Sequence, residues 1–420
     1  MQSEWTKSGV PFYRAREIVK LSKNGFVNND LFISEEHYQR LKNSYDVPRA
    51  GDLMVTGVGT IGKAYIVKDT DRFYYKDASV LCFENRTGAI ISDFAKMMIE
   101  SDLLQEQIHS KTYGNTVDTI TITTAENYIC VLPPLEEQQQ IISTLISVIE
   151  IIDEIENDRC NLLDTVKSLK SKILDLAIRG QLVPQDPADE PASVLLDRIR
   201  AEKEELIKQG KIKRDKKESV IFKGEDNSYY EKIGDTVTCI NEEIPFDLPE
   251  NWSWCRGFSC FSGMTTKKPD ADFFDYIDID SIDNKKHIVT SPKHLPSNEA
   301  PSRASRGLQY GSVVFSLVRP YLKNIAFINE NLTDCIASTG FYVCNSNGSF
   351  FPPFMFYLML SEYVINGLNE YMKGDNSPSI SKENIETWLY PVPPFEEQKC
   401  IVGKISELLS HIATIEAGLN

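Results

Sequence analysis

An internal repeat is the feature that most constrains how this chain can fold. Residues 132–142 (LPPLEEQQQII) recur as residues 392–402 (VPPFEEQKCIV), an offset of 260 residues. The same offset aligns Gly51 with Gly311, far upstream of the motif. A motif shared by chance would not hold register over such a distance, so we interpret the chain as two diverged copies of one domain. The alternative is two unrelated domains that share a short motif.

Each copy shows the same order of strand-like and helix-like segments. Runs of β-branched and aromatic residues predict strands at residues 52–56, 64–67, 80–83, 312–318, 325–328 and 341–344. Residues 94–108 and 354–368 read as helical, and a Gly/Asn turn and a short polar strand come before the paired prolines. This order predicts an α+β domain in each copy.

After the prolines, the apolar residues recur with a period of 3.5, which is typical of a coiled-coil seam. The seam positions are Ile141, Leu145, Val148, Ile152, Ile155, Leu162, Val166, Leu169, Ile173 and Leu176, then Ile401, Ile405, Leu408, Ile412 and Ile415. Only Arg159 interrupts the first series, and Gly180 is placed to end its helix. We predict that the two helices are each other's partner. Packing onto another protein or onto their own globular unit is the alternative.

Between the copies, three prolines at 184, 187 and 191 interrupt the first helix, and a second helix is predicted over residues 192–209. The basic run that follows, residues 211–217, either ends this helix in solvent or contacts phosphate.

Composition excludes several classes of protein. There is no run of 18 apolar residues and no leader pattern, which predicts neither a membrane span nor a secretory signal and favours a cytoplasmic location. Nine cysteines without a CxxC pair and five scattered histidines predict reduced, mostly buried thiols, no zinc site and no cofactor.

The net charge of -16 argues at first against affinity for nucleic acid. However, residues 131–250 hold 26 acidic and 16 basic residues, whereas residues 1–130 and 251–390 each have a net charge of only -2. Both copies can therefore present basic loops to DNA, with weak binding by this chain alone.

Two apparent catalytic motifs fail on their chemistry. Residues 57–63 fit GxxxxGK, but Ala64 replaces the Ser or Thr that a phosphate-binding loop needs. Residues 392–395 (VPPF) look like the amine clamp of adenine methyltransferases without its hydrogen-bond acceptor. Asp270, Asp283 and Lys285 loosely imitate the metal site of a magnesium-dependent nuclease, which stays open as an alternative in which the chain is an enzyme acting alone.

The whole pattern resembles the DNA-specificity subunit of type I restriction-modification enzymes. Besides the tandem units and PPxEEQ motifs, residues 174–187 (LDLAIRGQLVPQDP) and 245–254 (PFDLPENWSW) carry the resemblance. It implies a non-catalytic subunit with target-recognition domains at 1–134 and 248–394, each reading one half of a bipartite target in double-stranded DNA. It also implies helical conserved regions at 135–247 and 395–420.

In such a family the helical regions pair antiparallel, space the half-sites and dock two adenine methyltransferase (modification) subunits, and a motor-nuclease (restriction) subunit joins for cleavage. The 36 residues from 141 to 176 span about 54 Å as a helix, or about one and a half turns of DNA. Two features depart from the family pattern. The first copy lacks a counterpart of residues 248–254, and the helix that ends at Asn420 is shorter than its counterpart. Truncation, a partial gene or a rearranged form would explain both.

Base contacts require polar or cationic side chains on loops. On this ground we predict DNA contacts from Arg14, Arg16, Thr60, Lys63, Lys111, Asn115, Lys267, Lys268, Arg303, Arg306, Arg319, Tyr321, Lys323, Lys373 and Asn376. Lys63 and Lys323 hold the same place in both copies. Any one of these residues could instead be a solvated surface group. For the chain as a whole, the remaining alternative is a coiled-coil scaffold without a DNA role.

Overall fold

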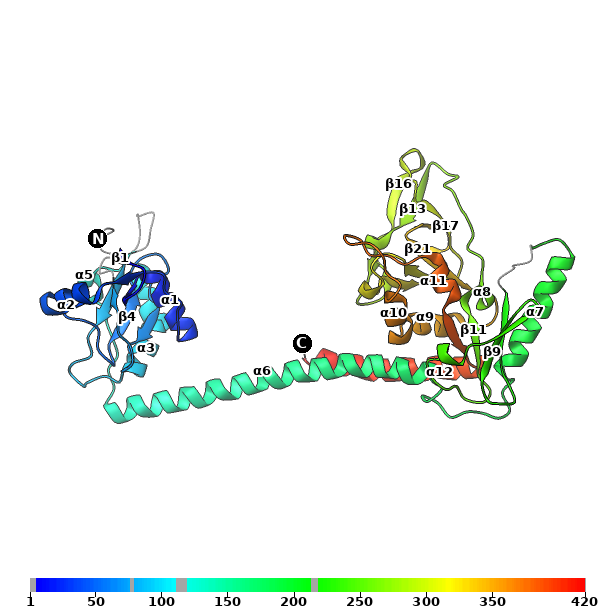
Figure 1. The fold of residues 1–420 in the computed structure, drawn as a ribbon. Helices are drawn as coiled ribbons and strands as arrows, with labels where there is room; N and C mark the ends of the chain where they lie inside the picture. Colours follow the sequence, from blue (N-terminus) through cyan, green and yellow to red (C-terminus); the bar gives the residue numbers. More distant parts are fainter. Residues whose placement is uncertain (1–4, 76–78, 111–118, 213–217, 420) are drawn as a thin grey trace. The chain divides into compact units, whose positions relative to one another are not determined.

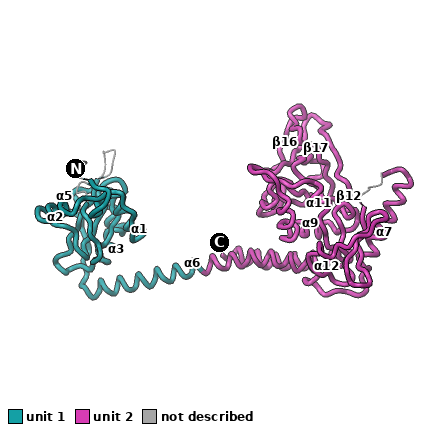
Figure 2. The backbone as a smooth tube through the Cα atoms, in the orientation of Figure 1, with its two compact units in different colours: residues 1–157 teal, residues 158–420 magenta. Residues whose placement is uncertain are grey.

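The computed structural model describes residues 5–75, 79–110, 119–212 and 218–419. The chain forms two compact units, unit 1 (residues 1–157) and unit 2 (residues 158–420), shown in Figure 2. Unit 2 includes residues 158–247 of the predicted central helical region. None of the helices within the described ranges is long and apolar enough to cross a membrane.

Unit 1 contains two small sheets with helices packed around them (Figure 1). One sheet has the order β5-β4-β7, formed by β4 (Leu53–Thr56), β5 (Ala64–Ile66) and β7 (Val80–Phe83). The other has the order β1-β3-β2-β6, formed by β1 (Trp5–Thr6), β2 (Val10–Tyr13), β3 (Phe32–Ile33) and β6 (Tyr74–Tyr75). The helices are α1 (Ala15–Asn24), α2 (Glu35–Ser44), α3 (Ser92–Glu100), α4 (Asp102–Ser110), α5 (Ile122–Ala125) and the start of α6 (Leu135–Ile178).

Unit 2 contains counterparts of both sheets and several additional elements. The sheets are β12-β21-β18-β19, formed by β12 (Phe261–Ser262), β18 (Val313–Ser316), β19 (Ile325–Phe327) and β21 (Phe341–Ser346), and β16-β13-β20-β17, formed by β13 (Phe273–Ile277), β16 (Lys293–Pro296), β17 (Ala304–Gly307) and β20 (Ile336–Ser338). The additional strands are β8 (Ser219–Lys223), β9 (Tyr229–Ile233), β10 (Thr236–Cys239), β11 (Ser253–Arg256), β14 (Ile282–Asp283), β15 (Ile288–Val289) and β22 (Leu389–Val392). The helices are α7 (Ala192–Lys208), α8 (Gly257–Cys260), α9 (Pro352–Leu360), α10 (Glu362–Asn369), α11 (Lys382–Thr387) and α12 (Phe395–Leu419).

The elements of the two units recur at the offset seen in the sequence. The pairs β4 and β18, α3 and α9, α4 and α10, and α6 and α12 each begin 260 residues apart. The parallel pairing of β2 with β6 also has a counterpart in the pairing of β13 with β20. The two units therefore share one α+β fold.

The last residue of each PPxEEQ motif explains why the motif recurs. Gln138 and Gln398 are fully buried, and each side chain uses all of its hydrogen-bonding groups. Its carbonyl oxygen accepts the backbone N–H of Ile91 (2.8 Å) or Phe351 (2.6 Å), the residue before α3 or α9. Its amide donates to the first proline of the motif and to a loop carbonyl. The glutamine thus joins the long helix to the globular part of its copy.

Three details of the expected pattern were wrong. The helices predicted at 94–108 and 354–368 are each broken at a serine, Ser101 or Ser361, because that serine has extended backbone with ψ near 150°. The short strand expected before the prolines is present in unit 2 as β22, but in unit 1 the described residues between α5 and the prolines form no strand. Four of the nine cysteines, at positions 130, 160, 239 and 400, are exposed rather than buried.

The two seam helices contact each other within unit 2. In unit 2, the second half of α6 and α12 run in opposite directions, and Lys170 binds Glu416 at 2.7 Å (Figure 1). Val166, Ile173, Ile401, Ile405 and Ile412 are buried in one core, and Leu176 and Leu408 are half-buried. The other seam residues are exposed, namely Ile141, Leu145, Val148, Ile152, Ile155, Leu162, Leu169 and Ile415. The predicted seam is thus covered only in part by this chain.

Candidate nucleic-acid interface

Two loops of unit 2 bring five of the predicted DNA-contacting residues together. The loop 317–324 follows β18, and the loop 372–379 follows α10. The backbone N–H of Arg319 donates to Pro378 at 2.8 Å, and its guanidinium donates to the carbonyl of Asn376 at 2.7 Å. Lys373 lies on the second loop, which is closed by its backbone pairing with Ser379. Tyr321 and Lys323 lie on the first loop, and Tyr321 is 46% exposed.

Arg319 and Lys323 both have a left-handed backbone, with φ of 48° and 55°. This conformation is uncommon for side chains with a Cβ, so the turn between them must be held by other contacts. It is held by backbone bonds from Leu322 to Arg319 (2.9 Å) and from Lys323 to Pro320 (2.8 Å). Strained backbone of this kind is often found at functional sites.

An open hollow of about 410 Å³ lies beside the loop 317–324. Asp280, Asn284, Arg319, Asn324 and Ser377 contribute polar groups to its wall. Asn284 also donates to the carbonyl of Leu322 at 2.8 Å, which ties the β14–β15 turn to this loop. The DNA contacts predicted from the sequence do not include Asn284 or the nearby Lys286. The signal was available in the Asp-Asn-Lys-Lys run at 283–286, where amide and ammonium groups sit on one turn.

The same turn weakens the nuclease alternative. The carboxylate of Asp283 accepts the backbone N–H groups of Lys286 (3.0 Å) and Lys285 (2.9 Å), and these bonds lower its pKa. Asp283 therefore caps a turn. Within the described residues, no group of three or more metal-binding side chains is brought together.

A second group of predicted residues lies around the edge strand β17. Thr266 pairs with Arg306, and the Lys267 ammonium donates to the carbonyl of Asp334 at 2.8 Å. Lys268 and Arg303 are exposed. The carbonyl of Arg303 accepts the backbone N–H of Thr339, and the carbonyl of the adjacent Gly340 accepts from Leu317. The two groups of cationic residues in unit 2 are therefore on adjoining loops.

Unit 1 has an equivalent loop at residues 57–63. It joins the antiparallel strands β4 and β5, and Val58 pairs with Thr119 as Val318 pairs with Ser379. Thr60 is exposed and Lys63 is half-buried. Since a strand and not a helix follows Lys63, this loop cannot act as a nucleotide-binding P-loop. The predicted residues Lys111 and Asn115 lie outside the described residues.

Arg14 and Arg16 are placed differently from the other candidates. Arg16 binds Asp30 through both carboxylate oxygens at 2.6 and 2.7 Å, and Arg14 binds Glu17 at 3.2 Å. Burial raises the pKa of Glu17, but hydrogen bonds from the two arginines outweigh it, so the net pKa is lowered. The hydrogen bond from Arg16 also lowers the pKa of Asp30. Carboxylates thus compensate the charges of both guanidinium groups at the start of α1. The two arginines are therefore less suited than Lys63 to binding phosphate.

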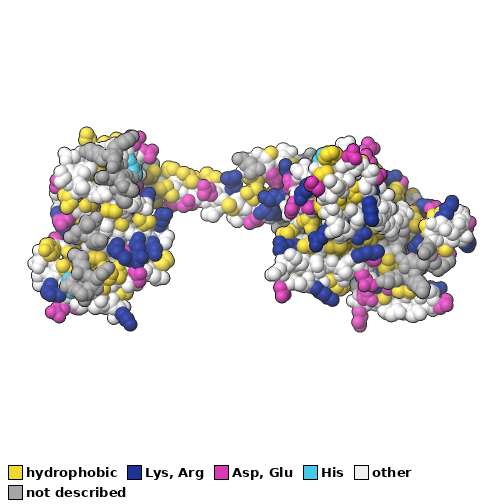
Figure 3. All heavy atoms as spheres, turned by 90° about the horizontal axis from the view of Figure 1, so that it is seen from above, with side chains coloured by type: hydrophobic (Ala, Val, Ile, Leu, Met, Phe, Trp, Pro, Cys, Tyr) yellow, Lys and Arg dark blue, Asp and Glu magenta, His cyan; other side chains and the backbone are white. Residues whose placement is uncertain are grey.

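Charge is mixed over the face of unit 2 seen in Figure 3. Lys and Arg side chains are distributed among polar, hydrophobic and some acidic side chains. An arrangement of this kind favours specific contacts from a few loops over strong general attraction to phosphate.

Comparison with known proteins identifies one domain and several relatives. Residues 2–164 match the family model described as the type I restriction modification DNA specificity domain. The chain is 28% identical over 338 residues to the specificity subunit of the type I restriction enzyme EcoAI from Escherichia coli, covering 68% of this chain. It is 30% identical over 264 residues to the EcoEI specificity subunit from the same species, covering 58% of this chain.

Residues 2–164 thus carry a type I restriction modification DNA specificity domain, and the chain is similar to type I specificity subunits. It spans 54% and 39% of the lengths of these two E. coli specificity subunits. Among solved structures, the HsdS subunit from Thermoanaerobacter tengcongensis is 35% identical, with 41% of this chain and 46% of that chain covered and a TM-score of 0.39. No comparison supports a nuclease or a scaffold without a DNA role.

Proposed function

We propose that this chain is the DNA-reading subunit of a type I restriction-modification complex in the cytoplasm, and that each unit reads one half of a bipartite target. The observation that carries this proposal is the pair of equivalent loops. In a chain similar to type I specificity subunits, residues 57–63 and 317–324 follow equivalent strands in both units and place a lysine at equivalent positions, Lys63 and Lys323. Two readers built alike on one chain suit a target made of two half-sites.

The chain's own role is recognition, and we assign catalysis to partner subunits. The exposed apolar positions of α6, from Ile141 to Ile155, are suited to docking adenine methyltransferase subunits. A motor-nuclease subunit would then join for restriction. Such partners would also supply most of the phosphate affinity, since this chain carries a net charge of -16.

The direct test is co-expression of the chain with a type I adenine methyltransferase subunit, followed by genome-wide mapping of methylated adenines. We expect one motif of two half-sites separated by a fixed spacer. Replacing residues 1–134 with the equivalent domain of a different specificity subunit should change one half-site only. A single contiguous motif, or a motif that is unchanged by the replacement, would contradict the proposal.

A further inference from the structure

The open hollow beside the loop 317–324 contains an asparagine side chain that has no partner among the described residues. Asn324 is only 7% exposed, and its backbone carbonyl accepts the N–H of Ser316 at 3.1 Å. Its side-chain amide lines the hollow and forms no hydrogen bond with any residue that the structure describes. The amide therefore presents two donors and an acceptor to a group that enters the hollow.

Arg319 supplies a second unsatisfied group in the same wall. Its Nε atom is buried and finds no acceptor in the described part of the chain, although Nη2 donates to the carbonyl of Asn376 at 2.7 Å. Arg319 follows the bridging residue Val318 as Gly59 follows Val58 in unit 1, and both have a left-handed backbone, with φ of 48° and 79°. Only glycine adopts this conformation without strain. Unit 2 thus keeps a side chain at a strained position, which points to a function.

The other residues of the wall indicate the kind of ligand. Ile279, Ile282 and Leu322 add apolar surface, and Asp280 and Ser377 add polar oxygens. The volume of about 410 Å³ lies in the range of sites for small organic groups, about 300–1,000 Å³. The negative charge of Asp280 disfavours a phosphate. The wall therefore suits a flat, uncharged group with donors and acceptors on its edge, which is the chemistry of a nucleobase.

The tip of the loop next to the hollow carries two exposed apolar side chains. Tyr321 and Leu322 are 46% and 40% exposed, and they lie in a single helical turn that begins at Pro320. The backbone bond from Lys323 to Pro320 and the bond from Asn284 to the carbonyl of Leu322, both 2.8 Å, fix this tip. Apolar side chains on a fixed tip can enter a base step, unstack it and displace a base.

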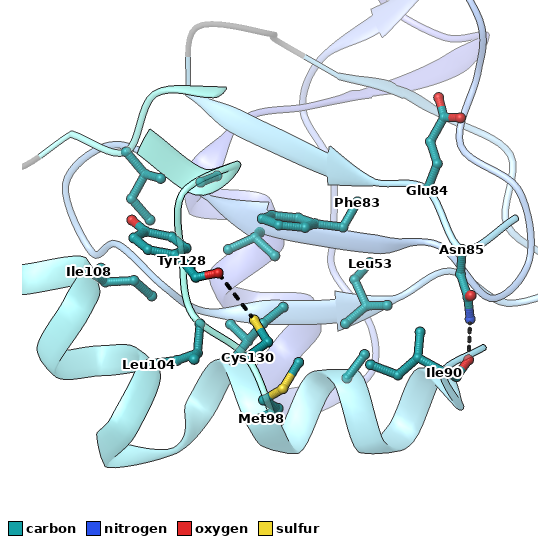
Figure 4. A pocket seen from close by; sticks show the side chains of 15 residues that line it. Leu53, Phe83, Glu84, Asn85, Ile90, Met98, Leu104, Ile108, Tyr128 and Cys130 are labelled. Carbon is teal, nitrogen blue, oxygen red and sulfur yellow. Dashed lines mark hydrogen bonds between the residues drawn. The ribbon is translucent and has the colours of Figure 1, made fainter. Parts of the chain in front are cut away.

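The described residues of unit 1 show no such arrangement. The cavity of unit 1 drawn in Figure 4 has a volume of about 190 Å³, and Leu53, Met98 and Leu104 are among the apolar side chains of its wall. None of the described residues that line it belongs to the loop 57–63, and that loop contains no aromatic residue. Among the described residues, an apolar tip beside a polar hollow therefore occurs in unit 2 only.

We propose that unit 2 holds one base of its half-site in this hollow, turned out of the DNA stack. Tyr321 and Leu322 enter the stack, the amide of Asn324 pairs with the edge of the displaced base, and Arg319 offers a further N–H. This base is distinct from the adenine that is methylated, because a methyltransferase takes that adenine into its own active site. The inference rests on the proposed function, since it requires unit 2 to lie on DNA.

The test is a mismatch scan of the target DNA, bound by the full chain in complex with methyltransferase subunits. The half-site of unit 2 is the one that stays unchanged when residues 1–134 are replaced. Each base of this half-site is kept while the base opposite is changed, and the methylated adenine and its partner are left out. A mismatch lowers the cost of turning a base out, so at one position it should tighten binding by about tenfold. At the other positions it should leave affinity unchanged or weaken it.

Two variants with matched controls connect this gain to the hollow. Asn324→Ala should weaken binding to matched DNA by about tenfold and remove the gain from the mismatch, whereas Asn331→Ala, at an exposed asparagine, should behave as wild type. Tyr321→Ala leaves buried residues unchanged. It should also weaken binding to matched DNA by about tenfold, and the mismatch should restore most of the loss. Tyr310→Ala, at an exposed tyrosine that precedes β18, is its control.

The outcomes separate this inference from the proposed function. A mapped bipartite motif without a mismatch that tightens binding would overturn the inference and leave the proposed function intact. The same holds if the gain is equal in Asn324→Ala and Asn331→Ala, because greater flexibility of mismatched DNA does not depend on Asn324. The absence of any half-site read by unit 2 would overturn both. Circular dichroism confirms that the variants are folded.

Discussion

The Nε atom of Arg159 donates a hydrogen bond of 2.7 Å to the carbonyl oxygen of Leu419, the residue that holds the same place in the second copy. Arg159 is the one polar residue in the seam of α6, and Leu419 is the last residue of α12. The last carbonyls of a helix have no partner within it and carry partial negative charge. The arginine therefore caps the end of the helix that packs against its own.

Replacing Arg159 should loosen the end of α12. We expect Arg159→Leu to leave the core of unit 2 intact and to lower the local stability of the last turn by about 0.5–1 kcal/mol, because one helix-end carbonyl loses a charged donor. Hydrogen exchange of the amides in residues 413–419 measures this effect. Lys167→Ala, which removes an exposed cation bound to Asp164, is the control and should leave that exchange unchanged.

The motif glutamine should be essential to unit 2. Gln398→Ala leaves the N–H of Phe351 and two carbonyls without their buried partner. We expect this to lower the free energy of unfolding of unit 2 by about 3 kcal/mol. Urea denaturation monitored by tryptophan fluorescence, which reports mainly on unit 2, tests this. The exposed neighbour Glu396 offers a matched control, and Glu396→Ala should change stability by less than about 0.5 kcal/mol. Equal effects of the two substitutions would refute the structural role of the glutamine.

Glu397 should make the stability of unit 2 depend on pH. Burial raises the pKa of Glu397 and outweighs the hydrogen bonds from Trp252 and Gln185. A carboxyl group whose pKa is higher in the folded state stabilises the fold fully below its unfolded pKa, and that contribution is lost as pH rises through the folded value. Glu397→Gln should therefore flatten the decline in urea midpoint above about pH 4.3, the ordinary glutamate value. A pH profile of Glu397→Gln identical to that of the wild type would contradict this role of Glu397.

Substitutions in the two equivalent loops should change the salt dependence of DNA binding. In a complex with methyltransferase subunits, we expect Lys63→Ala and Lys323→Ala each to reduce the slope of log affinity against log salt by about 1. Arg16→Ala should instead act mainly on the stability of unit 1, because Arg16 is bound to Asp30. An unchanged slope in the double lysine variant would favour a subunit in which these loops do not reach DNA.

The length of α6 should set the spacer between half-sites. Insertion of one heptad within residues 142–157 lengthens the helix by about 10 Å, or about three base pairs, and leaves the packing of α6 on α12 in unit 2 unchanged. Mapping of methylated adenines should then show both half-sites intact and a longer spacer. A spacer of the original length would contradict the hypothesis that the length of α6 sets the spacing of the half-sites.

Local patterns in the sequence were enough to identify the repeat, the strands β4, β7 and β21, and the helical seam. These features depend on residues close together in the chain, since side-chain periodicity follows directly from strand and helix geometry. The seam also predicted that the two helices are partners, and Lys170 in the second half of α6 forms an ion pair with Glu416 of α12.

Tertiary structure decided which of these residues are available for binding. Arginine is a residue type that often contacts DNA, but the fold places Glu17 next to Arg14 and Asp30 next to Arg16. Asn284 became part of the candidate interface only because its turn packs against the loop 317–324. Glu137 and Glu397 stand in the same motif, yet only Glu397 is buried, because β11 and the segment before it cover that side of unit 2. Burial depends on which distant segment packs against a residue, and no local pattern encodes it.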